Sequence, residues 1–226
     1  MFTIPLQNNC INALLSGGFS SKKIYHIFGV EGAGKSTICI DLAKRVALSG
    51  FKTLYVNSSH AFNIKRLEQI AGESFQEVSK LIFVQNPNSF SEQDKIINKL
   101  ENFITDKFRL IVLDDIISLS LDKNNTKLKP IVKNRMISRE LAILKNITKI
   151  FDVIVVVTNQ GTSVRADDEI TNPYLESVTT FYSDFDLEIK NTADSSLSKR
   201  ILTKIKPSEL SKKEQCEFNL TNSGIT

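Results

Sequence analysis

The residues best suited to chemistry form one glycine-rich run between a predicted strand and a predicted helix. The run consists of Gly29, Val30, Glu31, Gly32, Ala33, Gly34, Lys35 and Ser36, and Thr37 follows it. Spaced glycines let the backbone curl so that successive N–H groups can hold a phosphate. Lys35 then offers a cation to the β- and γ-phosphates, and Ser36 offers a hydroxyl to Mg²⁺. The pattern predicts a nucleoside triphosphate site, most simply for ATP, against the alternative of a chance glycine-rich turn.

Polar residues that end two apolar strands can complete this site. Residues 110–113 are all apolar, as expected for a parallel strand buried on both faces, and Asp114 follows them. Its carboxylate can hold Mg²⁺ or a water ligand of Mg²⁺. Asp115 can order a water or be a solvated strand-end charge. Gln160 follows the apolar residues 153–157 and can contact a γ-phosphate or serve only as a polar strand cap.

The order of apolar patterns predicts an α/β fold in one domain, residues 1–226. Helical spacing, such as that of Ile38, Leu42 and Val46, separates the early strand-like runs. We therefore expect a mostly parallel central sheet flanked by helices. The strand-like runs are at residues 23–28, 53–57, 81–84, 110–113, 153–157, 181–190, 199–206 and 215–221. The final three have no helical pattern between them, which predicts antiparallel strands at the C-terminal end.

Residues 1–5 lack the basic and apolar regions of a secretory signal, so we expect a cytoplasmic protein, and composition argues against a membrane span. Of the 226 residues, 41% are hydrophobic and 24% charged, and no run approaches the ~18 apolar residues that a spanning helix needs. The net charge of +4 is too small to imply nucleic acid by itself. Cys10, Cys39 and Cys216 lack the short spacing of zinc ligands or a redox pair, so we expect small buried or half-buried residues.

Together these motifs resemble the RecA/RadA recombinase core, and most of all the archaeal RadB group of RadA paralogues, which lack the N-terminal DNA-binding domain. The matching segments, in the family's order, are residues 11–19, 29–36, 54–56, 110–114 and 157–160. The resemblance implies a P-loop NTPase fold that binds ATP and Mg²⁺. It also implies that Lys35 and Asp114 act on the phosphates and that Gln160 couples nucleotide state to the loop beginning at Gly161.

Further roles rest on the resemblance alone. Arg66 lies in a segment whose arginine stacks on adenine in relatives. Lys204 and Lys206 resemble a lysine pair that, in some relatives, reaches the γ-phosphate of a neighbouring subunit.

One departure concerns hydrolysis. Relatives end the second strand with an aspartate and place a water-activating glutamate two residues later, whereas this chain has Asn57 and Ser59 there. Serine is a poor general base near neutral pH, so we expect ATP binding with weak or absent hydrolysis. His60 is the alternative base.

In relatives two loops contact DNA, and the first corresponds to residues 122–134. Its lysines are the predicted DNA-binding residues, Lys123, Lys127, Lys129 and Lys133. The second, residues 161–173, has Arg165 against three acids, which disfavours phosphate contact.

These features indicate an accessory protein of homologous recombination and DNA repair. It would bind single- and double-stranded DNA without regard to sequence, and contact a RadA-type recombinase or a junction-processing nuclease. Two alternatives remain: a KaiC-like regulatory module without DNA binding, and a true strand-exchange ATPase.

Overall fold

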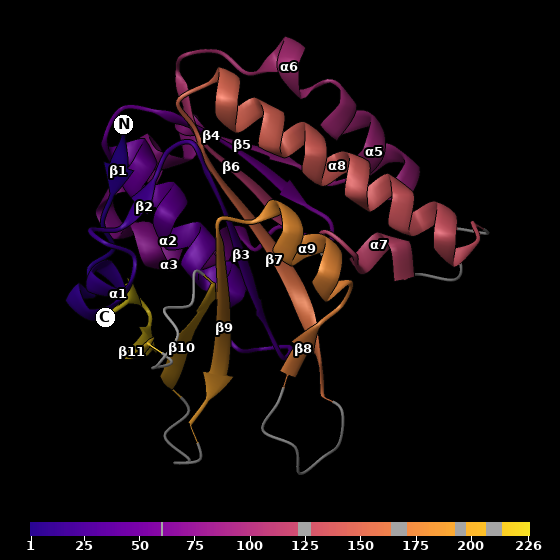
Figure 1. Cartoon of the computed structure of the whole chain (residues 1–226). Coiled ribbons are helices and arrows are strands. Elements are labelled where there is room, and N and C mark those ends of the chain that lie inside the picture. Colours follow the sequence, from indigo (N-terminus) through magenta and orange to yellow (C-terminus); the bar gives the residue numbers. More distant parts are fainter. Residues whose placement is uncertain (60, 122–127, 164–170, 193–197, 207–213) are drawn as a thin grey trace.

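The computed structural model describes residues 1–59, 61–121, 128–163, 171–192, 198–206 and 214–226. Most of its strands belong to one large mixed sheet with helices on both faces (Figure 1). The α/β architecture that the sequence predicts is confirmed.

The strand that leads into the glycine-rich loop, β3, lies inside the sheet between β9 and β7. Six neighbouring strands, from β9 to β5, are parallel, and β10, β11 and β12 continue the sheet antiparallel. In spatial order the strands are β12 (Gly224–Ile225), β11 (Glu214–Thr221), β10 (Lys199–Lys206), β9 (Phe185–Asn191), β3 (Lys23–Gly29), β7 (Ile154–Ser163), β6 (Phe108–Asp114), β4 (Lys52–Asn57) and β5 (Ile82–Gln85). In addition, β8 (Thr171–Pro173) pairs with β7, and β1 (Thr3–Ile4) pairs with β2 (Phe19–Ser20).

Helices cover both faces of the sheet. The first face is covered by α1 (Asn9–Leu14), α2 (Lys35–Leu48), α3 (Ile64–Ala71) and α4 (Phe75–Val78), with the short turns η1 (Gly72–Ser74) and η2 (Ser79–Leu81) beside them. The second face is covered by α5 (Phe90–Asn98), α6 (Leu100–Phe103), α7 (Ser118–Leu121), α8 (Pro130–Ile150) and α9 (Glu176–Tyr182). No helix in these described ranges is long and apolar enough to cross a membrane.

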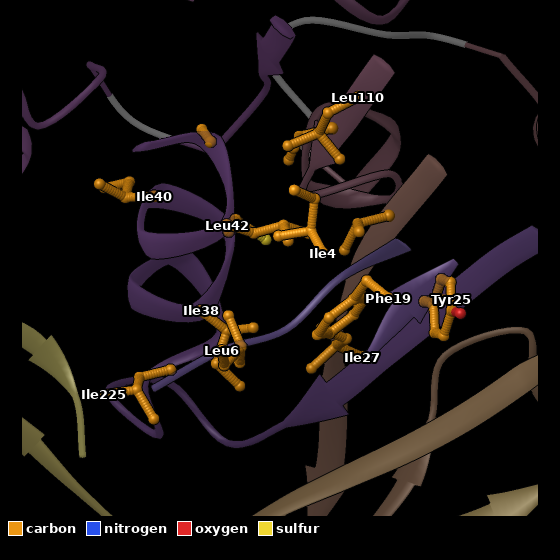
Figure 2. Close-up of a cluster of buried hydrophobic side chains, with 14 of the residues drawn as sticks. Ile4, Leu6, Phe19, Tyr25, Ile27, Ile38, Ile40, Leu42, Leu110 and Ile225 are labelled. Atoms are coloured by element: carbon orange, nitrogen blue, oxygen red, sulfur yellow. The ribbon is translucent and has the colours of Figure 1, made fainter. Parts of the chain in front are cut away.

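The two covered faces explain why the central strands are apolar at every position. In β6, Leu110 and Val112 belong to the cluster beneath α2, whereas Ile111 and Leu113 belong to the cluster beneath α8. Figure 2 shows residues of the first cluster, among them Ile38 and Leu42 of α2 and Ile27 of β3. This packing fixes α2 over β3, and with it the loop that joins them.

Two local predictions are wrong. The strand-like run 181–190 begins with Phe181 and Tyr182, but both residues belong to α9. Lys206 Nζ stabilises the end of that helix by donating to the carbonyl oxygens of Thr180 and Ser183 over 2.5 and 2.7 Å. The run's remaining strand, β9, pairs with β3 in parallel rather than extending the sheet antiparallel.

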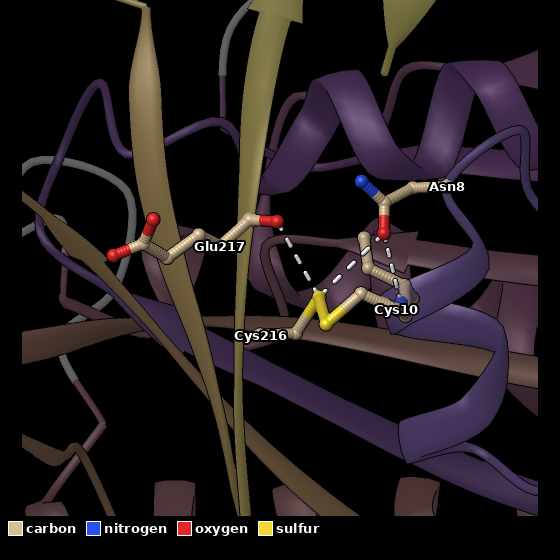
Figure 3. The surroundings of a disulfide bond; sticks show 5 residues. Asn8, Cys10, Cys216 and Glu217 are labelled. Atoms are coloured by element: carbon tan, nitrogen blue, oxygen red, sulfur yellow. Dashed lines mark hydrogen bonds between the residues drawn. A yellow bond between two sulfur atoms is a disulfide. The ribbon is translucent and has the colours of Figure 1, made fainter.

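The cysteines also differ from expectation. Cys10 of α1 is exposed and forms a disulfide with the buried Cys216 of β11, across a Cα–Cα distance of 5.7 Å (Figure 3). Asn8 Oδ1, which caps α1 by accepting from the Ile11 amide over 2.9 Å, lies 3.5 Å from Cys216 Sγ. Sequence spacing missed this pair because the two cysteines are 206 positions apart. Cys39 is free and buried, as expected.

A buried acid joins α5 to α8. Gln93 Nε2 donates to Glu140 Oε2 over 2.8 Å and to the carbonyl oxygen of Ile116 over 3.0 Å. Burial raises the pKa of Glu140 to about 8, against the Gln93 hydrogen bond and with the help of the Asp94 charge. The side chain is therefore mostly protonated at neutral pH in the folded protein.

Glu140→Gln should make the free energy of unfolding less dependent on pH. The folded-state pKa of Glu140 lies above its unfolded value of about 4.3. Its stabilising contribution is therefore full below the unfolded pKa, and is lost as the pH rises through the folded pKa. Removing this titration should stabilise the variant relative to the wild type by up to about 3 kcal/mol at neutral pH.

Urea unfolding at about pH 5 and about pH 7.5 measures this difference. Glu77→Gln, at an exposed position, is the matched control. Equal pH slopes in the wild type and Glu140→Gln would contradict the prediction.

Candidate functional site

The glycine-rich loop connects β3 to the first turn of α2, as predicted. Gly34 is the N-cap of α2 with φ 106°, and Gly32 has φ 74°, conformations that other residues rarely adopt. A Cβ on Gly34 would lie 2.7 Å from Leu220 Cδ1, and one on Gly29 would lie 2.4 Å from the carbonyl oxygen of Ile189. Close packing against β9 and β11, as well as the backbone conformation, therefore restricts which residues can occupy Gly29 and Gly34.

Lys35 is the first residue of α2, and its side chain folds back into the loop. Its Nζ donates to the carbonyl oxygens of Gly29 and Val30 over 2.8 and 2.9 Å. Burial lowers the pKa of Lys35, and the carboxylates of Asp115 and Asp114 act in the opposite direction. Because both direct partners are neutral carbonyl groups, they do not cancel the positive charge that the loop holds.

Asp114, at the end of β6, accepts hydrogen bonds on both carboxylate oxygens. Tyr55 Oη of β4 donates to Oδ2 over 2.7 Å, and Thr158 Oγ1 of β7 donates to Oδ1 over 2.5 Å. Burial, together with the charge of Asp114, raises the pKa of Tyr55 well above its ordinary value. The two hydroxyls fix the orientation of the predicted metal ligand. Local sequence spacing does not identify these two partners, although a tyrosine within a buried strand must find a partner for its hydroxyl.

Asp115 follows Asp114 through a cis peptide bond and is not the solvated charge considered above. Only 3% of the residue is exposed, and its Oδ1 accepts from the Ile117 amide over 3.0 Å. Burial raises the pKa of Asp115 to about 6, against the lowering effect of the Ile117 amide.

A cavity of about 260 Å³ opens between the loop and the ends of the central strands. It brings together predicted residues that are far apart in the sequence. Its lining consists of Glu31, Gly32, Gly34, Lys35, Ser36, Thr37, Ser59, Asp114, Asp115, Gln160 and Leu220. Of the other predicted loop residues, Gly29 and Val30 provide the carbonyl groups bonded to Lys35, and Ala33 is buried. Leu220, from the last long strand, was not predicted.

The end of β4 presents uncharged side chains to this region. Asn57 is buried, and its Nδ2 donates to Asn86 Oδ1 over 3.2 Å. Ser59 lines the cavity at the position where relatives place a glutamate. The alternative base, His60, lies outside the described residues.

The segment after Gln160 begins as a strand rather than a loop. Strand β7 continues through Gly161 to Ser163 and pairs with β8, and the Gln160 carbonyl accepts from the Tyr174 amide over 3.2 Å. Arg165 and its acidic neighbours lie outside the described residues.

Arg66, on α3, contacts the turn between β11 and β12. Its Nη2 donates to the carbonyl oxygen of Thr221 over 2.7 Å, and its Nη1 donates to that of Asn222 over 3.4 Å. Stacking of Arg66 on a purine stays a prediction. Arg66 is not among the described residues that line the cavity.

Three of the other predicted lysines, Lys133, Lys204 and Lys206, have partners within the chain. Lys204 forms an ion pair with Glu214, and Lys206 bonds the end of α9. Lys133 Nζ donates to the Ser120 carbonyl oxygen, whereas Lys129 is exposed at the N-cap of α8. Lys123 and Lys127 lie outside the described residues, so the DNA-binding assignment stays a prediction.

Comparisons with known proteins agree over nearly the whole chain. A family model described as Rad51 matches residues 2–226. A DNA repair and recombination protein RadB from Methanobrevibacter smithii is 31% identical over 225 residues, which cover 96% of this chain and 93% of the relative. A RadB from Methanocaldococcus jannaschii is 33% identical over 151 residues, 66% of this chain and 71% of the relative. The crystal structure of the RadB recombinase is similar in fold, with a TM-score of 0.77 at 24% identity over 96% of this chain and 95% of that chain.

Proposed function

The chain belongs to the Rad51 family, and from this premise we propose that it is an ATP-binding accessory protein of homologous recombination and DNA repair. Residues 1–226 act in this proposal as one RecA-like domain. ATP is the ligand of the cavity, with hydrolysis weak or absent, and DNA is the macromolecular ligand.

The observation that carries the proposal is the cavity where Lys35, Ser36 and Asp114 meet beside the glycine-rich loop. These donors suit a Mg²⁺-bound triphosphate. Within the described ranges no group of three or more His, Cys, Asp or Glu side chains is placed to hold a metal ion. Mg²⁺ usually keeps waters and binds through one or two protein oxygens together with phosphates, so it does not need such a cluster.

Each residue then has a role in binding. Lys35 and the loop amides orient the β- and γ-phosphates, and the N-terminal end of α2 adds its dipole. Bound Mg²⁺ would neutralise phosphate charge, with Ser36 and Asp114 as its protein ligands. Thr37 lines the phosphate end, Gln160 contacts the γ-phosphate, and Arg66 stacks on the base.

DNA binding is assigned to the segment that leads into α8. Lys129 is exposed there, and Lys133 lies one turn further along the helix. With Lys123 and Lys127, these cations would contact backbone phosphates of single- and double-stranded DNA, which carry no base information.

Replacing Lys127 and Lys129 together with alanine should weaken DNA binding and reduce the salt dependence of the affinity. Each lost phosphate contact removes the release of about one counterion, so the slope of log K against log salt should flatten by about one to two units. Titration of labelled single- and double-stranded DNA at several salt concentrations, with and without Mg-ATP, measures both quantities.

Lys149→Ala is the matched control, because Lys149 is exposed in the last turn of the same helix. An unchanged slope in the double variant would remove this segment from the interface. Normal ATP affinity without DNA binding at any salt concentration would favour the KaiC-like alternative.

The protein partners proposed are a RadA-type recombinase or a junction-processing nuclease. The similarity to DNA repair and recombination proteins named RadB supports this proposal. Co-sedimentation of the purified proteins, with and without DNA, distinguishes direct contact from contact through DNA.

A further inference from the structure

We infer that the oxidation state of the Cys10–Cys216 pair controls nucleotide affinity through strand β11. This inference rests on the proposed ATP site. It concerns two cysteines that take no part in the proposed binding chemistry.

One end of β11 is attached to α1 through the pair. Cys216 is buried and lies opposite Leu202 of β10, and Cys10 is on the exposed side of α1. The helix is attached to the chain start by Asn12, whose Oδ1 accepts from the Leu6 amide over 2.8 Å. The disulfide therefore fixes β11 to the N-terminal segment of the chain.

The other end of β11 lies against the nucleotide site. Leu220 lines the cavity, and its Cδ1 lies 2.7 Å from the position that a Cβ on Gly34 would take. Leu220 is four residues after Cys216, a distance of about 13 Å along a strand. A shift of Cys216 can therefore move Leu220, because only a short, extended segment separates the two residues.

Further contacts attach β11, β12 and the adjoining strand β10 to elements of the site. Arg66 donates to the Thr221 carbonyl oxygen over 2.7 Å. A Cβ on Gly224 would lie 3.1 Å from the carboxyl carbon of Asp41 on α2, so β12 is closely packed there. Arg200 of the adjoining strand β10 donates through Nε to the Ala33 carbonyl oxygen in the glycine-rich loop over 3.2 Å.

Both oxidation states of the pair have a physical basis. A thiolate of a dithiol attacks the sulfur of Cys10, an exposed residue, the S–S bond breaks, and Cys216 leaves as a thiolate that takes up a proton. The second thiol of the dithiol then displaces Cys10, which gives the oxidised dithiol and two cysteine thiols. The Cys216 thiol has acceptors at hand, Asn8 Oδ1 at 3.5 Å and the Glu217 carbonyl oxygen at 3.4 Å.

With the disulfide formed, β11 is held against the loop before nucleotide binds. With the disulfide reduced, nucleotide must order β11 as it binds, so affinity falls. Intracellular disulfides, where they occur, are often redox-sensing, which fits a pair with one exposed cysteine.

The test measures the dissociation constant of Mg-ATP for the full chain in reduced and in oxidised dithiothreitol, with free thiols counted by alkylation. We expect one free thiol in the oxidised protein, from Cys39, and at least about 5-fold tighter ATP binding than in the reduced protein. By linkage, saturating Mg-ATP should shift the dithiothreitol equilibrium of the pair by the same factor.

Two variants provide controls. Cys10→Ser with Cys216→Ser should bind ATP equally in both buffers, and Cys39→Ala should keep the full response. Equal affinity of the oxidised and reduced wild type would overturn the inference, as would three free thiols after oxidation or a response that survives in the double variant. Absence of ATP binding in both states would remove the proposed site itself, and the inference with it.

Discussion

Lys35→Ala should bind ATP about 10²–10⁴-fold more weakly than the wild type while keeping its fold. The wild-type ammonium group would donate charge-assisted hydrogen bonds to the β- and γ-phosphates, each contributing about 1.5–3 kcal/mol. In the structure its partners are the Gly29 and Val30 carbonyl groups, which loop amides or water can satisfy after truncation. The variant therefore loses binding, whereas the hydrogen bonds of both carbonyl groups can be replaced.

Isothermal titration with ATP and Mg²⁺ measures the loss, and thermal unfolding checks the fold. Lys107→Ala is the matched control, because Lys107 is exposed before β6, at the opposite end of the strand from Asp114. Wild-type affinity in a folded Lys35→Ala protein would refute the assignment of the glycine-rich loop.

Wild-type protein should hydrolyse ATP at about 10⁻³–10⁻¹ s⁻¹, far below the ordinary range of enzymes. Ser59 lines the cavity at the position where relatives place their water-activating glutamate. Asn57, two residues earlier, donates a hydrogen bond to Asn86. Loss of a positioned general base removes about 10²–10⁴ in rate, whereas binding by Lys35 and Asp114 does not depend on it. Single-turnover measurements with radiolabelled ATP determine the rate.

Ser59→Glu should raise the rate, and Ser59→Gln, of nearly the same size but without charge, should not. Aligned geometry is needed for the gain, so the wild-type rate is the more decisive measurement. A wild-type kcat of ~1–10³ s⁻¹ that Asp114→Ala abolishes would falsify slow hydrolysis and leave His60 as the base to test.

The sequence predicts best the strands that are buried on both faces, because their central residues are all apolar. Residues 110–113 and 153–157 are apolar throughout because helices cover both sheet faces, and both runs are strands. For Phe181 and Tyr182 the predicted strand is wrong. Their aromatic side chains favour a strand, but Lys206, distant in the sequence, bonds the carbonyl groups that end helix α9.

The residues of the site also differ in how well the sequence predicts them. The loop signature is contiguous, so its glycines and Lys35 could be identified from spacing alone. The hydroxyl partners of Asp114 depend on β4 and β7 being the neighbours of β6, which local spacing does not state. Leu220 reaches the cavity only because β10 and β11 extend the sheet beyond β9.

The hydrogen bonds of Lys35 also bear on which anions can compete for the site. Its ammonium group has two backbone acceptors in its own loop, so an anion gains this cation only by displacing them. Chloride or acetate brings a single negative charge, and each would lose part of its hydration on entering the loop. A triphosphate brings several charged oxygens that can engage the ammonium group and the loop amides together. If the loop holds a triphosphate as proposed, it should favour a ligand that can replace both contacts at once over small anions.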